Sequence, residues 1–517
     1  MTQPERRVAE GYDLFLSLER AVRQYRDQPA VVDADLRWTY GDLHRACVHM
    51  ASALTARGLG PGDRVAVMAA NSAAYLTAYY AVPLAGMVLV PLNTRLQEPE
   101  VLAQVTDCSP AVILADPLHR LRAEAVAVAC GIDVLDLDGT VVGQGATDPD
   151  PAVLSRRAPD ELAAIFYTGG TTGRAKGVML THENLAVNAL HMVIGLGYSP
   201  ADTYLHCAPM FHLGDGMSLY PLTWVGGRHV IVPRFDPAAV IEAIARESVT
   251  CTFLVPTMLT GLVEHLTATP TTEPLSSLRL VVHGGAPIAR TLLDRAMVAL
   301  PCSFTQSYGM TEAGPILSFL PREEALGDSP TLQSAGRPVV GVEVRVTRPD
   351  GAECEPGEIG EITARGPNVS CGYWNQPEVT AEKFRDGWYR SGDLAYRDDT
   401  DHLFIIGRAG DVVISGGENI YAAEVEAALA GHPEVVECAV FAVPDAHWGE
   451  TVAAAVVIRS SQATTEDLDR HCRALIAGYK VPRRYEVHTR LPRTGAGKID
   501  KARLREPHWR DHGRGVS

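Results

Sequence analysis

The strongest chemical signal in the sequence is a loop rich in hydrogen-bond donors that follows an apolar strand. Residues 167–182 read YTGGTTGRAKGVMLTH, and the donors are Thr168, Gly169, Gly170, Thr171, Thr172, Gly173 and Lys176. Glycines let the backbone turn sharply and present N–H groups to an anion, while hydroxyls and a lysine add donors. These groups suit a triphosphate. The loop is not a Walker A motif, because no Gly-Lys-Ser/Thr occurs in it, and it is not a GxGxxG motif.

A second cluster, SYGMTE at Ser307–Glu312, combines groups that could hold a nucleotide. The ring of Tyr308 can stack on a base, and Gly309 lets the backbone approach a phosphate. Glu312 can ligate Mg²⁺, which favours one or two carboxylates completed by phosphate oxygens and water. Alone the hexapeptide is a weak signal, because Glu312 could equally be an exposed helix residue.

Three more residues could complete a nucleotide site. Asp393 ends the motif WYRSGD, and a carboxylate can accept both hydroxyls of a ribose. Arg408 ends the motif HLFIIGR and can reach sugar and phosphate oxygens. Lys498 lies in a glycine-flanked loop, PRTGAGKIDK. Taken singly, each of the three has a plain interpretation as a charged loop residue in water.

The elements that must position these residues alternate between strand and helix over the first four hundred residues. Longer segments with helical spacing, such as Leu43–Leu54 and Ala238–Ala245, lie between short apolar runs. Such alternation predicts mainly parallel sheets covered on both faces. The expected strands are Val65–Met68, Val88–Pro91, Val112–Leu114, Ala164–Tyr167, Val230–Val232, Phe253–Val255 and Leu280–His283.

The pattern changes in the last third of the chain. Val342–Thr347 and Glu358–Thr363 alternate apolar and polar residues, which indicates half-exposed antiparallel strands. From about Asp411 a βαββα-like order follows, enough for a separate small domain. The fold class is therefore α/β, with sheets flanked by helices and an antiparallel part in a large N-terminal body, and a small mobile α+β C-terminal domain. We predict domains at 1–409 and 410–517.

Composition excludes some classes of protein. Lys+Arg is 46 against Asp+Glu 62, a net charge of −16, which argues against broad nucleic-acid binding but allows a local basic pocket. The ten cysteines form no CxxC pair and no zinc spacing, as expected for reduced thiols.

Residues 1–10 lack the apolar core of a signal peptide. The apolar window Ala73–Val90 contains Pro83 and Gly86, which favours a buried helix and strand over a membrane span. We expect a cytoplasmic protein with no integral membrane segment.

Taken together, the motifs resemble those of the adenylate-forming superfamily, which includes acyl-CoA synthetases, firefly luciferases and the adenylation domains of peptide synthetases. The resemblance covers nearly the whole chain and rests on the order YTGGTTGRAKG, SYGMTE, RSGD, GRxxD and GK. It implies an enzyme that uses ATP and Mg²⁺ to convert a small-molecule acid into an acyl-adenylate, with release of pyrophosphate. The acyl group then passes to an acceptor.

The resemblance also implies roles for individual residues. The segment from Thr168 to Lys176 would hold the β- and γ-phosphates, Tyr308 would stack on the adenine, and Thr311 would touch the α-phosphate. Glu312 and Thr171 would bind Mg²⁺. Asp393 would hold the ribose with help from Arg408. The remaining implied nucleotide-site residues are Gly284, Gly285, Ala286, Ser307, Gly309 and Ile405.

Lys498 would bridge the acid and the α-phosphate. Attack of a carboxylate on a phosphate joins two anions, so a positioned cation and Mg²⁺ offset the repulsion. By the same resemblance His212, in the PMFH segment, would gate the acyl pocket, and the acid would enter beyond it, near Gly214–Met217 and the 283–287 turn. The other interpretation of His212 is a histidine packed behind an apolar loop.

The resemblance implies that the C-terminal domain rotates between the two half-reactions. One pose brings in Lys498, and the other brings Gly416 and Gly417 over a tunnel for the thiol of coenzyme A. Ser415–Glu426, SGGENIYAAEVE, resembles CoA ligases and favours coenzyme A as acceptor. Relatives usually place Asp or Lys at the pivot, whereas this chain has Gly410, the residue type with the widest backbone freedom.

Alternatives remain open for the second step. The acceptor could be a carrier-protein thiol or an amine, and a few relatives activate nitrite instead of a carboxylic acid. A non-catalytic nucleotide sensor is disfavoured, because Lys498, Glu312 and Thr311 are all present. A homodimer is compatible with the sequence. The identity of the acid is not encoded locally, because pocket walls come from side chains distant in sequence.

Overall fold

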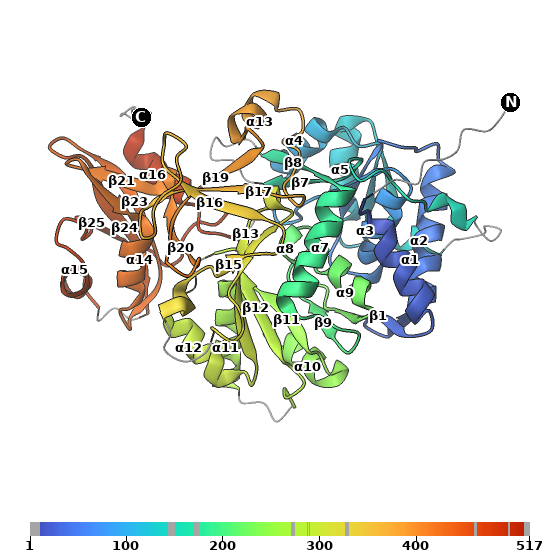
Figure 1. Cartoon of the computed structure of the whole chain (residues 1–517), viewed down its shortest axis with the longest axis horizontal. Coiled ribbons are helices and arrows are strands. Elements are labelled where there is room, and N and C mark those ends of the chain that lie inside the picture. The colour runs from blue at the N-terminus through green and yellow to red at the C-terminus, as the bar shows by residue number, and fades with distance from the viewer. Residues whose placement is uncertain are drawn as a thin grey trace.

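The chain folds into a large body and a smaller C-terminal unit at one end of it (Figure 1). The computed structural model describes residues 11–142, 150–168, 175–269, 274–286, 288, 290–325, 330–459, 463–494 and 497–510. In Figure 1 the N-terminal helices, in blue, lie at the opposite end of the molecule from the C-terminal unit, in orange to red.

The first sheet of the body has six strands in the order β6-β5-β3-β4-β7-β8. All neighbours are parallel except the β7–β8 hairpin. Its strands are β3 (Arg64–Met68), β4 (Val88–Pro91), β5 (Val112–Ala115), β6 (Asp133–Asp136), β7 (Leu162–Thr168) and β8 (Lys176–Thr181).

The second sheet of the body has nine strands in the order β15-β14-β13-β12-β11-β9-β10-β1-β2. The central strands from β13 to β1 are parallel, and β2, β14 and β15 pair antiparallel at the two edges. Its strands are β1 (Pro29–Asp33), β2 (Leu36–Thr39), β9 (Thr203–His206), β10 (Arg228–Ile231), β11 (Cys251–Leu254), β12 (Leu280–Gly284), β13 (Ser303–Gly309), β14 (Ile316–Phe319) and β15 (Arg337–Pro338).

Helices cover both sheets of the body. Helix α3 contacts β4 and β7 of the first sheet and β1 of the second, and α7 contacts β8 and β14. Both helices therefore lie between the two sheets. The helices of the body are α1 (Leu14–Tyr25), α2 (Tyr40–Thr55), α3 (Ala73–Leu84), α4 (Glu98–Cys108), α5 (Arg120–Cys130), α6 (Leu137–Val142), α7 (His182–Leu196), α8 (Leu213–Gly216), α9 (Leu219–Val225), α10 (Pro237–Glu247), α11 (Pro256–Ala268), α12 (Arg290–Ala299) and α13 (Pro377–Lys383).

An antiparallel sheet completes the body and precedes the C-terminal unit. Its strands are β16 (Glu343–Thr347), β17 (Gly360–Arg365), β18 (Phe384–Arg385), β19 (Trp388–Arg397) and β20 (Leu403–Arg408). The C-terminal unit has a mixed sheet flanked by three helices. Its elements are β21 (Val412–Ser415), β22 (Glu418–Tyr421), α14 (Ala422–Ala430), β23 (Val435–Asp445), β24 (Gly449–Ile458), α15 (Thr465–Leu475), β25 (Arg484–Val487) and α16 (Lys501–Trp509).

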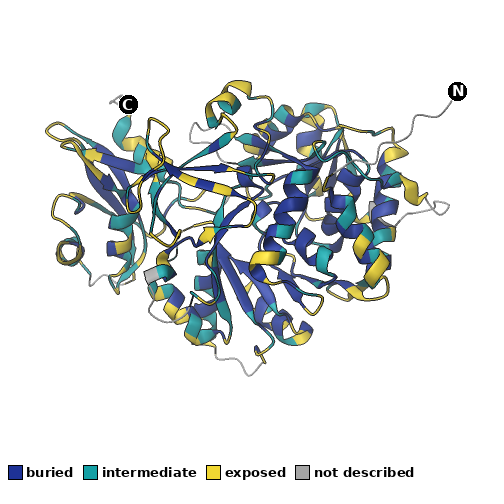
Figure 2. Cartoon of the chain, in the orientation of Figure 1, coloured by how far each residue is buried: buried dark blue, intermediate teal, exposed yellow. Residues whose placement is uncertain are grey.

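Burial follows this arrangement. The central strands and α7 are mainly dark blue in Figure 2, and every residue of α3 is buried. The apolar window Ala73–Val90 is thus a buried helix followed by strand β4, as its proline and glycine predict. Within the described part of the chain, no helix is long and apolar enough to cross a membrane.

The predicted fold class is confirmed. Parallel sheets flanked by helices form the body, antiparallel strands follow at β16 and β17, and a small α+β unit ends the chain. The C-terminal unit has hydrophobic clusters of its own, from Val413 onward. The domain boundary between residues 409 and 410 remains a prediction.

Candidate active site

The candidate active site lies where parallel strands of both body sheets end. Thr168 ends β7, Gly284 ends β12, Gly309 ends β13, and His212 lies in the loop after β9. Ligands of open α/β sheets bind outside the carboxyl ends of the strands, because the connecting loops converge there. The sheets therefore bring together motifs that are far apart in the sequence.

The predicted phosphate loop is described only at its two ends. Thr168 and Lys176 are paired in the β7–β8 register, and the Thr168 hydroxyl donates to the Lys176 carbonyl at 3.5 Å. The Lys176 ammonium lies 5.3 Å from the ring centroid of Tyr373. The predicted residues Gly169, Gly170, Thr171, Thr172 and Gly173 lie outside the described residues.

Asp393 is the centre of a small polar cluster at the end of β13. The Tyr308 hydroxyl donates to Asp393 Oδ2 at 2.8 Å, and Arg408 Nε lies 3.0 Å from Oδ1. Asp393 and Arg408 are cross-strand partners in the β19–β20 pair. Burial, and then the nearby Asp393 carboxylate, raises the pKa of Tyr308, so its hydroxyl stays protonated as a donor. Ile405 lies on β20 and is partly buried against the main core.

The glycines that end β12 and β13 leave no room for a side chain. A Cβ on Gly284 would lie 2.5 Å from both the carbonyl oxygen and the hydroxyl of Ser307. A Cβ on Gly309 would lie 1.8 Å from the Pro315 carbonyl oxygen. Gly285 has φ +75°, a left-handed conformation that favours glycine. Gly285 and Ala286 are exposed, so this turn opens toward solvent.

Glu312 is nearly buried and is held by a residue that the sequence did not reveal. The Tyr373 hydroxyl donates to Glu312 Oε1 at 2.9 Å, and the ring of the same tyrosine faces Lys176. Tyr373 thus connects the predicted metal ligand to the lysine of the phosphate loop. Thr311 precedes Glu312 in the same short 3-10 turn, Thr311–Ala313. One buried carboxylate near Lys176, at the end of the predicted phosphate loop, fits Mg²⁺, which takes few protein ligands and completes its shell with phosphate and water.

Lys498 reaches this site from the C-terminal unit. Its side chain is exposed to solvent, yet the protein crowded around it lowers its pKa, and the charge of Arg408 lowers that pKa further. Asp393 and Glu312 act in the opposite direction. The lysine therefore lies within electrostatic range of Asp393, the predicted ribose ligand, and of Glu312, the predicted metal ligand.

His212 and Arg95 also lie near Lys498. Burial, followed by the charges of Arg95 and Lys498, lowers the pKa of His212 to about 4, so the imidazole is neutral at physiological pH. The Arg95 guanidinium lies 6.0 Å from the ring centroid of Phe211, and its Nη1 would be 3.5 Å from a Cβ on Gly497. Sequence reasoning missed Arg95. Its signal was a cation four residues beyond the end of a buried parallel strand.

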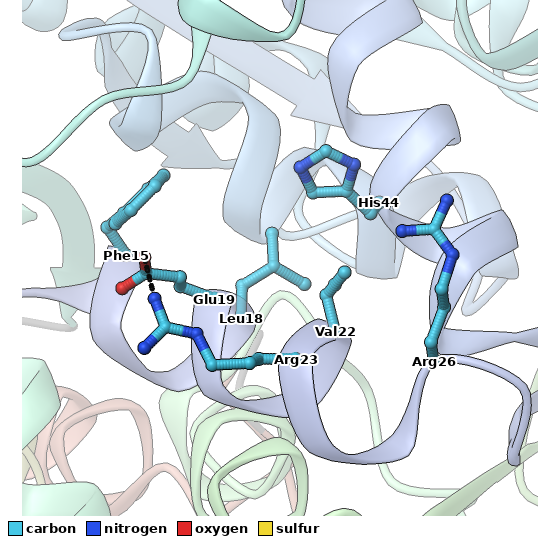
Figure 3. Close-up of a pocket in the computed structure, with 7 residues that line it drawn as sticks. All are labelled: Phe15, Leu18, Glu19, Val22, Arg23, Arg26 and His44. Carbon is cyan, nitrogen blue, oxygen red and sulfur yellow. Dashed lines mark hydrogen bonds and ion pairs between the residues drawn. The ribbon is translucent and has the colours of Figure 1, made fainter.

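Gly416 and Gly417 are not brought to this site. They form the β21–β22 turn, where the Gly416 amide donates to the Trp448 carbonyl at 2.9 Å, within the C-terminal unit. Figure 3 shows a cavity of about 400 Å³ whose lining residues include none of the motif residues. It is lined by α1 residues from Phe15 to Arg23, by Arg26 and by His44 of α2.

Two protein-family models match the chain, and both belong to AMP-binding enzymes. The model of the AMP-binding enzyme family matches residues 18–374, and that of the AMP-binding enzyme C-terminal domain matches residues 424–498. The first match alone covers well over half of the chain. The chain belongs to the AMP-binding enzyme family, and the resemblance inferred from its motifs is confirmed.

Three curated relatives match nearly the whole chain. A feruloyl-CoA synthase from Amycolatopsis sp is 40% identical over 493 residues, which are 94% of this chain and 97% of the relative. A 2-succinylbenzoate--CoA ligase from Bacillus licheniformis is 34% identical, covering 92% and 96%. The fatty acid--[acyl-carrier-protein] ligase ScoC from Streptomyces coeruleorubidus is 34% identical, covering 95% of each chain.

Two solved structures share the fold over almost all of this chain. ATP-bound MatB from Rhodopseudomonas palustris superposes with a TM-score of 0.87 at 34% identity, covering 96% of this chain and 99% of MatB. The o-succinylbenzoate coenzyme A synthetase MenE from Bacillus subtilis, in complex with ATP and a magnesium ion, has a TM-score of 0.83 at 32% identity, covering 93% and 98%.

Proposed function

We propose that the chain is an AMP-forming acyl-CoA ligase. First, a carboxylate oxygen of the acid attacks the α-phosphorus of ATP, and pyrophosphate leaves. Then the thiol sulfur of coenzyme A loses its proton and attacks the acyl carbon, and AMP leaves. The observation that carries the proposal is that the C-terminal unit places the Lys498 loop against the body, with Gly497 beside Arg95, near the Asp393 cluster held by Tyr308 and Arg408.

Each side chain has a physical task in the first step. Asp393, fixed by Tyr308 and Arg408, would accept the ribose hydroxyls and so place the α-phosphate. Lys498 would offset the repulsion between the carboxylate and the phosphate and stabilise the charge that develops on the phosphoryl oxygens. Glu312, with Thr171 as a second ligand, would hold Mg²⁺, which when bound neutralises phosphate charge.

The surroundings of the His212 loop favour an acid with an uncharged tail. Gly214 faces Phe253, whose ring would be 3.4 Å from an added Cβ, and Met217 accepts a hydrogen bond from the buried Asn188 amide at 3.4 Å. These neighbours carry no positive charge. The positive charges near His212, on Arg95 and Lys498, would serve the carboxylate that is activated, and a second carboxylate among the uncharged neighbours of Gly214 and Met217 would lose its hydration at a cost of several kcal/mol. We therefore propose a monocarboxylic acid such as ferulate as the substrate.

The proposed function predicts its products. With ATP, Mg²⁺, coenzyme A and ferulate, we expect AMP, pyrophosphate and the acyl-CoA thioester in equal amounts, measured by pyrophosphate release and mass spectrometry. 2-Succinylbenzoate, with two carboxylates, should be a poorer substrate, and a fatty acid is the third acid of the panel. Stoichiometric ADP and phosphate would contradict adenylation. A thioester that forms with a carrier protein but not with coenzyme A would favour the carrier-protein alternative.

Gly410 is the proposed pivot of the C-terminal unit. It occupies the second position of a turn in which the Val412 amide donates to the Ala409 carbonyl, and a Cβ there would meet nothing within 4 Å. The second position of such a turn is the one that proline favours, because its φ is fixed near about −65°. Proline should therefore suit the present pose, in which Lys498 faces the body.

Gly410→Pro is expected to keep adenylation near normal and to slow transfer to the thiol by about tenfold or more, because the unit can no longer turn. Both half-reactions are measured separately, together with the melting temperature. Gly410→Ala is the matched control, since it adds a Cβ in open space and leaves the turn free to change. A stable Gly410→Pro enzyme with both steps intact would place the pivot elsewhere.

A further inference from the structure

A chain of buried polar side chains lies beneath the His212 loop. It joins Asp215 on α8, Tyr204 and His206 on β9, His229 on β10 and Thr223 on α9, and we call it the buried polar chain. Tyr204 Oη lies 3.0 Å from Asp215 Oδ1, and His206 Nδ1 lies 3.0 Å from Oδ2. His206 Nε2 lies 3.1 Å from His229 Nδ1, whose ring Nε2 lies 3.2 Å from the Thr223 hydroxyl.

All five side chains are sealed from water, with relative exposures of 0–1%. Because a carboxylate has no proton to give, the Tyr204 hydroxyl and His206 Nδ1–H must both donate to Asp215. Burial, and then the proximity of His206, lowers the pKa of His229, so that ring is neutral. Its Nδ1–H therefore donates to His206 Nε2, and its Nε2 accepts from the Thr223 hydroxyl. Each group along the chain has a matching partner. A buried carboxylate is tolerated only under such conditions.

Asp215 is connected to His212 through one turn of helix. The amide of Asp215 donates to the His212 carbonyl at 3.3 Å, and that of Gly216 donates to the same oxygen at 3.0 Å. On the other side of His212, the Asn71 side chain accepts from the Met210 amide at 2.8 Å and donates to the Ala208 carbonyl at 2.8 Å. The loop is therefore held at both ends by buried polar contacts.

Helix α8 has little room to shift. A Cβ on Gly216 would lie 2.0 Å from the Tyr79 hydroxyl, which itself donates to the Met210 carbonyl. A Cβ on Gly214 would touch the Phe253 ring at 3.4 Å. Close steric contact limits α8 on these faces, and the buried polar chain anchors it to β9. The position of His212 follows from these constraints.

We propose that the buried polar chain positions the acid site, with Asp215 as the residue that fixes α8 and thereby His212 and Gly214. This rests on the proposed function, in which the acid enters beside His212. A second buried aspartate beside strand β9, Asp202, provides the comparison with Asp215. Asp202 precedes β9 at the end away from the site, where it pairs with Arg279 at 2.6 Å and accepts from Thr250 at 2.7 Å. That carboxylate holds the fold without reaching the His212 loop.

The test compares Asp215→Ala with Asp202→Asn in the full-length enzyme. We expect Asp215→Ala to raise the KM for ferulate about tenfold while the KM for ATP stays within about twofold, because the nucleotide end of the site is untouched. Asp202→Asn should lower the melting temperature and leave both KM values near normal. If the two variants lose stability alike and neither changes the KM for ferulate, the positioning role is refuted.

A conservative variant keeps the test decisive if Asp215→Ala does not fold. In Asp215→Asn the amide oxygen still accepts from Tyr204, and the amide N–H can donate to His206 Nδ1 if both histidines shift their ring protons and Thr223 becomes the acceptor. We expect this variant to retain most of the ferulate affinity and to show the ring protons of both histidines moved in ¹⁵N NMR. A ferulate KM raised as much by Asn as by Ala, without that proton shift, would overturn the proposal.

NMR of the His212 imidazole in the absence of substrate tests the positioning role of Asp215 independently of the proposed function. The imidazole resonances of His212, assigned with His212→Gln, should shift in Asp215→Ala and stay in place in Asp202→Asn. If the wild-type protein releases pyrophosphate with none of the three acids, the proposed function fails, and these resonances still decide the positioning role. His212 resonances unchanged by Asp215→Ala would refute it.

Discussion

Replacing Lys498 by alanine is expected to slow adenylation by about a hundredfold or more, because the variant loses a positive charge at the reacting centre. Transfer of the acyl group from a supplied acyl-adenylate to coenzyme A should stay near the wild-type rate, since the lysine serves only the pose in which it faces the body. The measurement is single-turnover kinetics of each half-reaction with ferulate.

The control for this variant is Lys480→Ala. Lys480 belongs to the same C-terminal unit, but its ammonium pairs with Glu424 at 2.7 Å, so its loss should leave adenylation unchanged. Equal losses in both half-reactions of Lys498→Ala would contradict a unit that turns between two poses. An adenylation rate that survives the loss of Lys498 would show that another cation, with Arg95 the first to test, serves the α-phosphate.

Asp393→Asn is the second substitution with a large expected effect. The amide can no longer accept hydrogen bonds on two oxygens, and Arg408 loses the carboxylate 3.0 Å from its Nε. Losing a hydrogen bond to a charged group costs about 1.5–3 kcal/mol, so kcat/KM for ATP should fall by about 10- to 150-fold. Steady-state kinetics with ATP varied and the acid saturating measures this fall.

Asp398→Asn provides the matched control. Asp398 lies in the turn of the same β19–β20 hairpin, where its carboxylate accepts the amides of Thr400 and His402 at 2.9 Å. The substitution removes the same charge from the same hairpin, away from Tyr308 and Arg408. We expect its kcat/KM for ATP to match the wild type. A comparable fall in both variants would show that Asp393 acts through hairpin stability and not by holding the ribose.

Much of the fold was predictable, because it depends on neighbours along the chain. The apolar runs at Val88–Pro91 and Leu280–His283 are strands since their residues are β-branched or apolar and are bounded by turn-forming residues. The switch to alternating residues at Val342–Thr347 predicts an antiparallel strand for the same local reason, and the structure has β16 at Glu343–Thr347. The short edge strands β15 and β18 carried no such pattern and were missed.

The candidate site was predicted in part. The identity and order of Lys498, Asp393, Glu312 and the predicted phosphate loop resemble those of the adenylate-forming superfamily, and that resemblance implies adenylating chemistry. Gly284 and Gly309 were also predicted site residues. Only a residue without a Cβ allows the close approach of the ends of β12 and β13 to their neighbours. The chemical groups of the candidate site, and their order along the chain, can therefore be read from the sequence itself.

The tertiary structure alone decided which of these residues meet. Tyr373 reaches Glu312 and Arg95 reaches the lysine loop only because sheet register and loop closure bring distant segments together, and Asp215 meets His206 because the loop after β9 folds back on that strand. The sequence also left the orientation of the C-terminal unit undetermined, because Gly410 can adopt several combinations of φ and ψ. Local sequence sets the propensity of each element, but contacts between side chains hundreds of residues apart depend on the packing of the whole chain.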